Sequence, residues 1–175
     1  TVPERCRVCY TCVRECPAKA IRIIEGQARV IHERCIGCGN CVRVCSQGAK
    51  QIVNTVDQAR ALLAGPHPVA ALVAPSFAAE FGEELARPLA QAIRMLGFNH
   101  VHEVGFGADL VAHRYQQLLQ QESGQRYIAT SCPAIVLFVE KHHPSLVPSL
   151  APIVSPMVAM ARVVRKIHGS DLRTV

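Results

Sequence analysis

The pattern of hydrophobic and polar residues changes near residue 55. Before that point the apolar stretches are short, and residues 21–24 and 29–32 each have the length and composition of a short strand. The turn Glu25-Gly26-Gln27 lies between them and suits a hairpin. The first part of the chain therefore predicts a small domain with a pair of short strands.

A short helix is predicted between the two parts of the chain. Residues 57–64 have helical composition, and Gly65-Pro66 ends the helix. We therefore expect one domain over residues 1–56, a linker helix over 57–66 and a second domain over 67–175.

The second domain alternates strand-like and helix-like segments. Val69–Ala74 is a continuous apolar run of strand length, which is typical of a buried parallel strand. Strand and helix alternate along the rest of the chain, which favours a parallel sheet with crossover helices, that is, an α/β lobe. Further strands are expected at 101–104, 127–130 and 172–175, and helices at 80–96, 109–122, 134–143 and 157–168.

Eight of the nine cysteines lie in the first 45 residues, in two runs with the spacing C-x2-C-x2-C-x3-C. The first run is Cys6, Cys9, Cys12 and Cys16, and the second is Cys35, Cys38, Cys41 and Cys45. Each cysteine of the second run follows its counterpart by 29 positions, and Ala20-Ile21-Arg22-Ile23 is repeated as Ala49-Lys50-Gln51-Ile52. One structural unit is therefore duplicated.

This spacing predicts two 4Fe–4S clusters. Three cysteines at x2 intervals point their sulfurs at one iron–sulfur cube, and the fourth, on the helix that follows, reaches the cube of the other repeat. Bacterial two-cluster ferredoxins have this run, so the first domain resembles an α+β ferredoxin-like two-cluster domain. We assign Cys6, Cys9, Cys12 and Cys45 to one cluster, and Cys35, Cys38, Cys41 and Cys16 to the other. Because the ligands cross, neither half is expected to fold without metal.

Zinc and disulfides are the alternatives for these thiols. Structural zinc usually takes paired C-x2-C knuckles without a third cysteine at x2. Disulfides suit short secreted domains, whereas this chain shows no signal segment and an odd cysteine count. One irregularity is that Pro17 follows Cys16 but Ser46 follows Cys45. We expect both clusters to form despite it.

Charge and composition limit the choice of partner. The chain has 19 Lys+Arg and 13 Asp+Glu, a net charge of +6, which two clusters of about −2 each reduce to about +2. There is no Trp and there are three Tyr, so we expect no nucleic-acid partner. No apolar run reaches 18 residues, so no membrane span is predicted. The basic residues near the thiols offset cluster charge or dock an acidic redox partner; these are Arg5, Arg7, Arg14, Arg34, Arg43 and Lys50. Iron–sulfur chemistry implies a reducing compartment, and we expect the cytoplasm.

Cys132 is the ninth cysteine, in Thr130-Ser131-Cys132-Pro133-Ala134 between a predicted strand and a predicted helix. Ligands of open parallel sheets bind at the carboxyl ends of strands, which is where a metal ligand or reactive thiol would lie. The alternative is a buried cysteine that packs as a small hydrophobic residue. Among the eight histidines, His100 and His102 share one face of a strand, and His142-His143 suit a solvated helix end.

Several short motifs of residues 67–175 carry a family resemblance. They are Ala74-Pro75-Ser76-Phe77, Phe81-Gly82-Glu83-Glu84, Leu96-Gly97-Phe98-Asn99-His100-Val101, Gly107-Ala108-Asp109-Leu110, Tyr127–Glu140, His143-Pro144 and Ser155-Pro156-Met157. With these motifs the segment resembles the beginning of the catalytic domain of iron-only (FeFe) hydrogenases, an oxidoreductase family of anaerobic metabolism, and a two-cluster ferredoxin unit is that family's usual electron entry. The resemblance implies that Cys132 belongs to the first of three motifs that hold the hydrogen-activating cluster.

The chain departs from the family in two respects. The family's first motif commonly reads Thr-Ser-Cys-Cys-Pro, whereas this chain has a single cysteine there. We favour Cys132 as the ligand and not the proton relay, because Thr130 and Ser131 also match; the divergent, sensory hydrogenases resemble this sequence more than the fast enzymes do. The family's other ligands lie beyond Val175, so we expect an incomplete chain, inactive as these 175 residues alone.

The cysteine spacing thus predicts electron transfer through two 4Fe–4S clusters, and the resemblance implies that they feed a hydrogen-oxidising, proton-reducing or hydrogen-sensing site. A third, hydrogen-activating cluster forms if the missing ligands are supplied, with Cys132 as its candidate ligand and the candidate catalytic residue. The alternative is a non-catalytic electron-carrier subunit or scaffold. In either case we expect redox partner proteins, such as the other subunits of a larger hydrogenase or oxidoreductase complex.

Overall fold

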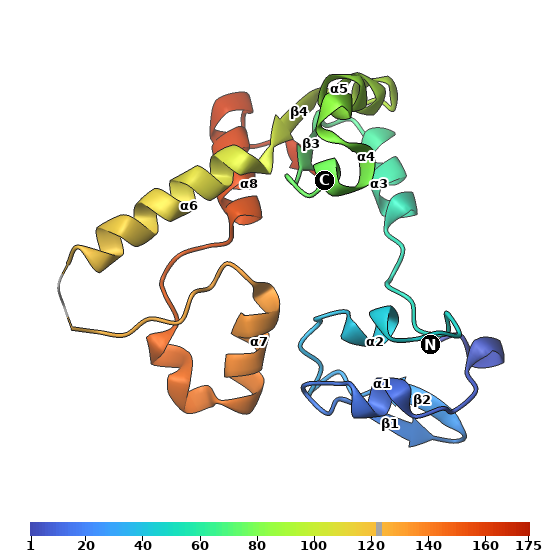
Figure 1. Ribbon diagram of the computed structural model, residues 1–175. Helices are drawn as coiled ribbons and strands as arrows, with labels where there is room; N and C mark the ends of the chain where they lie inside the picture. Colours follow the sequence, from blue (N-terminus) through green and yellow to red (C-terminus); the bar gives the residue numbers. More distant parts are fainter. Residues whose placement is uncertain (122–123) are drawn as a thin grey trace. The chain divides into compact units, whose positions relative to one another are not determined.

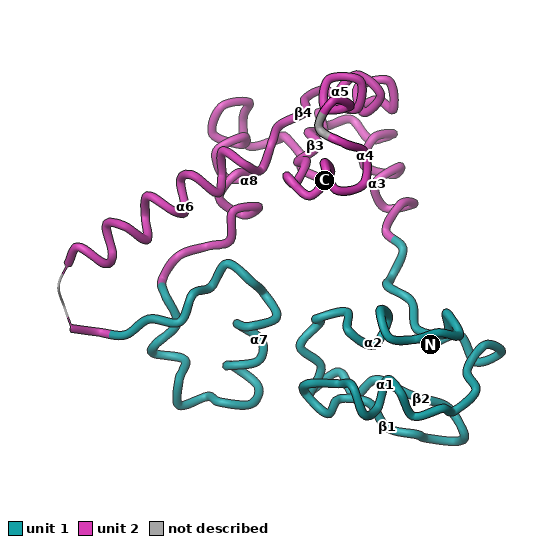
Figure 2. Tube along the Cα trace, viewed as in Figure 1, with its two compact units in different colours: residues 1–54, 126–151 teal, residues 55–125, 152–175 magenta. Residues whose placement is uncertain are grey.

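The computed structural model describes residues 1–121 and 124–175, apart from the side chain of Glu83. The chain divides into two compact units (Figure 2). Unit 1 contains residues 1–54 and 126–151, and unit 2 contains residues 55–125 and 152–175. The chain therefore leaves the second unit once, contributes a segment to the first, and returns.

The first 54 residues of unit 1 form short elements around a strand pair (Figure 1). Strand β1 pairs antiparallel with β2, so that Ile21 lies opposite Val30. Glu25 and Gly26 form the turn with φ of 51° and 69°, the left-handed pair of a tight hairpin turn. This two-residue turn makes the second strand begin at Gln27, two residues before the prediction. The elements are η1 (Pro3–Arg5), α1 (Thr11–Arg14), β1 (Ile21–Ile24), β2 (Gln27–Val30) and α2 (Asn40–Arg43).

The backbone repeats with the same period as the cysteines. Left-handed φ values occur at Val8, Tyr10 and Lys19, and again 29 residues later at three glycines, Gly37, Gly39 and Gly48. Helices α1 and α2 each begin directly after one of these residues, Tyr10 and Gly39. The duplication seen in the sequence is therefore also a duplication of backbone conformation.

The later segment of unit 1 packs against the cysteine-bearing part. It contains α7 (Pro133–His142) and η3 (Pro144–Ser149). Leu137 and Phe138 of α7 contact the buried cluster of unit 1, which comprises Cys12, Cys16, Ala18, Ala20, Ile21, Ala28 and Ile36. The strand predicted at 127–130 is wrong: Ile128 forms an isolated parallel bridge with Leu150 instead. Residues 127–130 belong to unit 1, so they do not join the parallel sheet, which lies in unit 2.

Unit 2 is built on a parallel sheet, which confirms the predicted α/β lobe. Its strands lie in the order β4-β3-β5, and β3 pairs in parallel with both neighbours. The register places Ala70 beside His100 and Leu72 beside His102. The elements are α3 (Val56–Leu63), β3 (Val69–Val73), α4 (Phe77–Phe81), η2 (Glu83–Leu85), α5 (Ala86–Met95), β4 (His100–Glu103), α6 (Val104–Leu119), α8 (Pro156–His168) and β5 (Arg173–Thr174).

Two helices of unit 2 differ from their predicted bounds. The helix expected at 80–96 is broken at Gly82, whose φ of 79° does not continue a helix, so α4, η2 and α5 replace it. The helix expected at 109–122 begins at Val104, directly after β4, so Gly105 and Phe106 are helical. Its predicted last residue, Glu122, lies outside the described residues.

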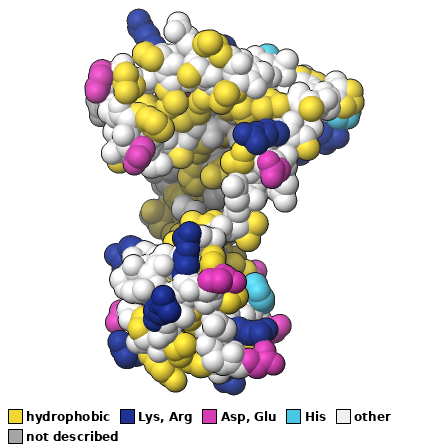
Figure 3. Space-filling model, turned by 90° about the vertical axis from the view of Figure 1, so that its right-hand side faces the viewer, with side chains coloured by type: hydrophobic (Ala, Val, Ile, Leu, Met, Phe, Trp, Pro, Cys, Tyr) yellow, Lys and Arg dark blue, Asp and Glu magenta, His cyan; other side chains and the backbone are white. Residues whose placement is uncertain are grey.

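Helix α8 covers the sheet through a small apolar core. Val164 and Met160 of α8 pack with Ala70 of β3 and with Leu172, which is fully buried. Other apolar side chains of this unit are exposed, including Met95 and Leu96 at the end of α5, and Figure 3 shows hydrophobic side chains gathered on the face of unit 2 that it draws. Among the residues described, no helix combines the length and apolarity that a membrane crossing requires.

Gly107 is the point of closest approach between α6 and α8. A Cβ atom there would overlap the carbonyl oxygen of Pro156 and lie 3.0 Å from the Cβ of Met160. We expect Gly107→Ala to lower the free energy of unfolding by about 1–3 kcal/mol, because the two helices must separate. Urea unfolding of the iron-loaded chain, followed by helical circular dichroism, measures this change.

Gly105→Ala is the matched control in the same helix. A Cβ at Gly105 would meet only the Cγ of Pro75, at 3.9 Å, an ordinary contact. Alanine at this position is expected to be neutral or stabilising by up to about 1 kcal/mol. Equal destabilisation by both substitutions would contradict the assigned role of Gly107.

Candidate metal centres

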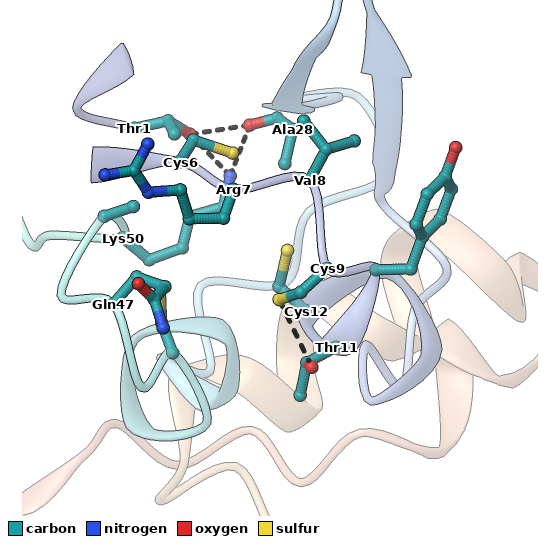
Figure 4. Close-up of a pocket in the computed structure, with 13 residues that line it drawn as sticks. Thr1, Cys6, Arg7, Val8, Cys9, Thr11, Cys12, Ala28, Gln47 and Lys50 are labelled. Carbon is teal, nitrogen blue, oxygen red and sulfur yellow. Dashed lines mark hydrogen bonds between the residues drawn. The ribbon is translucent and has the colours of Figure 1, made fainter. Parts of the chain in front are cut away.

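The first pocket of unit 1 brings together thiols from both cysteine runs. Cys6, Cys9 and Cys12 come from the first run and Cys45 from the second. Cys6 directly follows η1, Cys12 lies within α1, and Cys45 lies just beyond α2. Figure 4 shows Cys6, Cys9 and Cys12 on the wall of this pocket, together with Lys50.

The second pocket has the reciprocal composition. Cys35, Cys38 and Cys41 come from the second run and Cys16 from the first. Its remaining walls are mainly apolar and include Ile21, Val30 and Ile36. The structure thus brings together the two sets of four that crossed ligation predicts. That each set holds a cluster stays a prediction.

The described thiols do not form the compact group that a single metal ion requires. Four thiolates on one tetrahedral zinc, at 2.3 Å each, would lie about 3.8 Å apart. Over the described ranges, no three of the cysteines have sulfur atoms that all lie within 4.8 Å of one another. A cube spreads its ligands wider, because each thiolate binds a different iron. Both pockets therefore have the four-thiol donor set that a 4Fe–4S cube requires.

Backbone N–H groups point at several of the sulfurs. The amide of Ala20 donates to Cys16 Sγ at 3.3 Å, and the amide of Gly37 donates to Cys35 Sγ at 3.4 Å. Backbone hydrogen bonds, led by that of Lys50, lower the pKa of Cys45. The Thr11 side chain, 3.4 Å from Cys9 Sγ, likewise lowers the pKa of Cys9. These donors favour the thiolate form that binds iron.

Burial opposes ionisation at the two thiols inside the helices. Burial raises the pKa of Cys12 and Cys41, and the nearby charge of Lys50 counteracts this at both. Without iron, these thiols therefore favour the neutral form. Iron bound at these thiols would displace their protons, so we expect its binding to be coupled to proton release and to the folding of unit 1.

Lys50 is a buried cation beside both sets of thiols. It is 4% exposed, and its Nζ donates to the Thr1 Oγ1 at 2.6 Å and to the Ala28 carbonyl oxygen at 2.7 Å. Figure 4 shows these bonds on the wall of the first pocket. Its charge acts on Cys12 of one set and on Cys41 of the other. Lys50 is therefore placed to offset the negative charge of both metal centres.

Cys132 lies outside both pockets. It is exposed and occupies the N-cap position of α7, directly before Pro133. The sequence placed it at the carboxyl end of a sheet strand, but its segment belongs to unit 1 and the parallel sheet to unit 2. The expected position at the helix start is thus present, whereas the expected sheet edge is not.

The other end of α7 is hydrogen-bonded to the second cysteine loop. Lys141 Nζ donates to the carbonyl oxygens of His32 at 2.9 Å and Cys35 at 2.7 Å. His142 Nε2 lies 2.9 Å from the carbonyl oxygen of Arg34, so it is a partnered residue and not the solvated helix end that the sequence suggested. Sequence analysis missed this interface, because a Lys-His pair at a helix end is also typical of solvated surfaces.

Comparisons with known proteins agree with the two parts of the chain. Residues 1–46 match the family described as 4Fe-4S dicluster domain. Residues 67–175 match the family described as iron only hydrogenase large subunit, C-terminal domain. Since this second match covers more than half of the chain, the chain belongs to the iron-only hydrogenase large-subunit family.

A curated relative places the chain near the divergent members of that family. The cytosolic Fe-S cluster assembly factor NAR1 of Yarrowia lipolytica is 30% identical over 96 residues, which cover 53% of this chain. The aligned region is 20% of the relative's length. The chain therefore spans about a fifth of that protein.

Iron counting in paired variants tests the crossed ligation. We expect Cys9→Ala/Cys45→Ala to retain about four irons per chain, because both substitutions fall on one set. Cys9→Ala/Cys16→Ala removes a ligand from each set and is expected to lose nearly all iron. Iron and acid-labile sulfide, measured on anaerobically purified protein, report the result.

Uncrossed ligation predicts the reverse outcome. In that arrangement Cys9 and Cys16 serve the same cluster, so their double variant keeps about four irons and the Cys9/Cys45 variant keeps none. The Cys132→Ala chain is the control, since its thiol lies outside both pockets.

Proposed function

We propose that this chain carries electrons through two 4Fe–4S clusters and delivers them toward a hydrogenase-type site at the start of α7. The observation that carries the proposal is the convergence of eight thiols from two runs into two pockets of four. The dicluster and hydrogenase-family matches on the same chain support it.

In each pocket some residues would hold the cluster, and others would stabilise its negative charge. The four thiolates of each set hold a cluster, which when bound exchanges one electron at a time. The amide donors to Cys16, Cys35 and Cys45 stabilise negative charge on sulfur. Lys50 favours the more negative, reduced state of both centres through its positive charge.

Helix α7 links the second set of thiols to Cys132 and so defines the direction in which electrons would be transferred. Its C-terminal end is hydrogen-bonded to the loop that bears Cys35, and Leu137 packs beside Gly37 in the same loop. Its N-terminal end carries Cys132, roughly 15 Å away along a ten-residue helix. The second set of thiols is thus joined to the candidate hydrogenase ligand by one rigid element.

The proposed site oxidises hydrogen, reduces protons or senses hydrogen. Residues 67–175 contain one cysteine, Cys132. A third cube at this position takes four thiolates, of which Cys132 would be one. The thiolate clusters require a reducing compartment, for which we propose the cytoplasm, and a protein redox partner that exchanges electrons with them.

An electron carrier or scaffold is the second candidate function. The relative in Yarrowia lipolytica is named an iron–sulfur assembly factor, not a hydrogenase. The single cysteine in the first hydrogenase motif also fits a scaffold, because proton relay has no second thiol there. In this function the two clusters exchange electrons with a partner, and Cys132 has no part in the exchange.

Metal content and electron paramagnetic resonance separate the two candidates. About eight irons per chain, with the spectrum of two interacting reduced clusters after dithionite, is expected for the electron-transfer domain. Iron beyond about eight, with a further signal lost in Cys132→Ala and kept in Ser131→Ala, supports the hydrogenase-type site. Unchanged spectra and unchanged electron transfer to a partner in Cys132→Ala support the carrier, and zinc in place of iron contradicts both.

Removal of the Lys50 charge is expected to lower the reduction potentials. Lys50→Met takes a buried positive charge from beside both thiol sets, so each reduced cluster becomes less stable. We expect a shift on the order of 50 mV or more toward negative values in a potentiometric titration.

Two control variants accompany Lys50→Met: one retains the positive charge at residue 50, and the other removes a positive charge elsewhere. Lys50→Arg retains the charge and is expected to keep most of the potential. Arg22→Met removes an exposed charge from β1 and is expected to shift it little, because solvent screens that site. Equal shifts in Lys50→Met and Arg22→Met would show that the position of Lys50 is unimportant.

A further inference from the structure

Unit 2 contains a group of three histidines that neither the clusters nor Cys132 explains. His100 and His102 lie on β4, and His168 is the last residue of α8. A ring nitrogen from each lies within 4.8 Å of one from both others. The Nε2 atoms of His102 and His168 are 3.2 Å apart.

The fold brings these residues together from 66 positions apart in the chain. His100 and His102 project from one face of β4, while Val101 and Glu103 take the other. Their register partners are Ala70 and Leu72 of β3, which contact the core that α8 forms on the sheet. The two histidines therefore share the sheet face that α8 covers.

His168 is held at the same face by the end of α8. Gly169, with φ of 102°, ends the helix, and its amide donates to the Arg165 carbonyl oxygen at 2.9 Å. Leu172 follows and is fully buried, and Arg173 then pairs with Val69 in the sheet. All three imidazoles thus extend from elements anchored in one core.

The nitrogen separation matches that of two ligands on one metal ion. Imidazole nitrogens bind zinc at 2.0–2.1 Å, so two of them in a tetrahedral site lie about 3.3 Å apart. The rings of His100 and His168 are stacked, with centroids 3.9 Å apart. His100 adds a third imidazole to this pair, since one of its ring nitrogens lies within 4.8 Å of a ring nitrogen of each of the other two.

The charge state of the rings also favours a metal. Burial lowers the pKa of His100 and His102, and neighbouring histidines lower it further. Neutral imidazoles present the lone pairs that a metal ion takes. In the part of the chain that the structure describes, the group contains histidines alone and no thiol or carboxylate.

We propose that His100, His102 and His168 form a divalent-metal site for zinc, with the fourth position left to water or an exogenous ligand. Three imidazoles without sulfur suit zinc and its borderline neighbours, not the iron–sulfur clusters that the thiols hold. The ion ties the edge strand β4 to the end of α8 and provides an open coordination position.

Zinc binding to the iron-loaded chain tests the site. We expect about one zinc per chain to remain after gel filtration, while iron stays near eight. His102→Ala and His168→Ala are each expected to weaken zinc binding more than about tenfold, measured against a chromophoric chelator, since loss of a ligand costs at least as much as loss of an outer-sphere partner. His113→Ala is the control, because His113 is exposed on α6, outside the group.

Zinc X-ray absorption on the unmodified chain gives a second readout that needs no variant. Ligands at 2.0–2.1 Å with imidazole scattering support the site, and they do so even if a variant fails to fold. Sulfur at about 2.3 Å would show zinc in the cysteine pockets and overturn the proposal. Failure of the unmodified chain to retain zinc, or retention unchanged in folded His102→Ala and His168→Ala, overturns it as well.

Discussion

The structure of unit 1 depends on bringing eight thiols into two pockets in which burial disfavours the negatively charged thiolate form. Burial raises the pKa of Cys12 and Cys41, whereas iron binds the thiolate. Amide donors and the Lys50 charge act against this effect of burial and favour the thiolate form, as a bound metal would also do. Residues 1–54 contain only short strands and helices, so we expect their folding to be coupled to metal binding.

The crossed thiols explain why Lys50 is the buried cation. It lies five residues after Cys45, the thiol that the second run contributes to the first pocket. Its amide faces Cys45, and its ammonium charge reaches thiols of both pockets. In the first repeat the corresponding residue is Ile21, which lines the second pocket instead. The two repeats therefore differ at this position, and the charge of Lys50 acts on thiols of both pockets.

Short sequence patterns correctly predicted the features that depend on residues close together in the chain. Cysteine spacing alone defined the two sets of four that the structure brings together, and the apolar run at Val69 predicted the central parallel strand. The strand at 127–130 failed because a strand needs a partner, and its surroundings in unit 1 offer Leu150 alone as a bridge among the residues described. His168 could not be joined to His100 from sequence, since only the packing of α8 on β3 brings them together.

The path of the chain couples the cysteine domain to the hydrogenase-family segment. Residues 126–151 fall within the hydrogenase-family match, yet they pack in the unit that holds the thiols. Lys141 and His142 bind carbonyl oxygens in the 32–35 loop, which bears Cys35 of the second thiol set. Loss of order in this loop would remove the acceptors of Lys141 and His142 and the contacts that Leu137 and Phe138 of α7 make with the buried cluster of unit 1. The position of Cys132 at the start of α7 is therefore tied, through this helix, to the loop that bears Cys35 of the second thiol set.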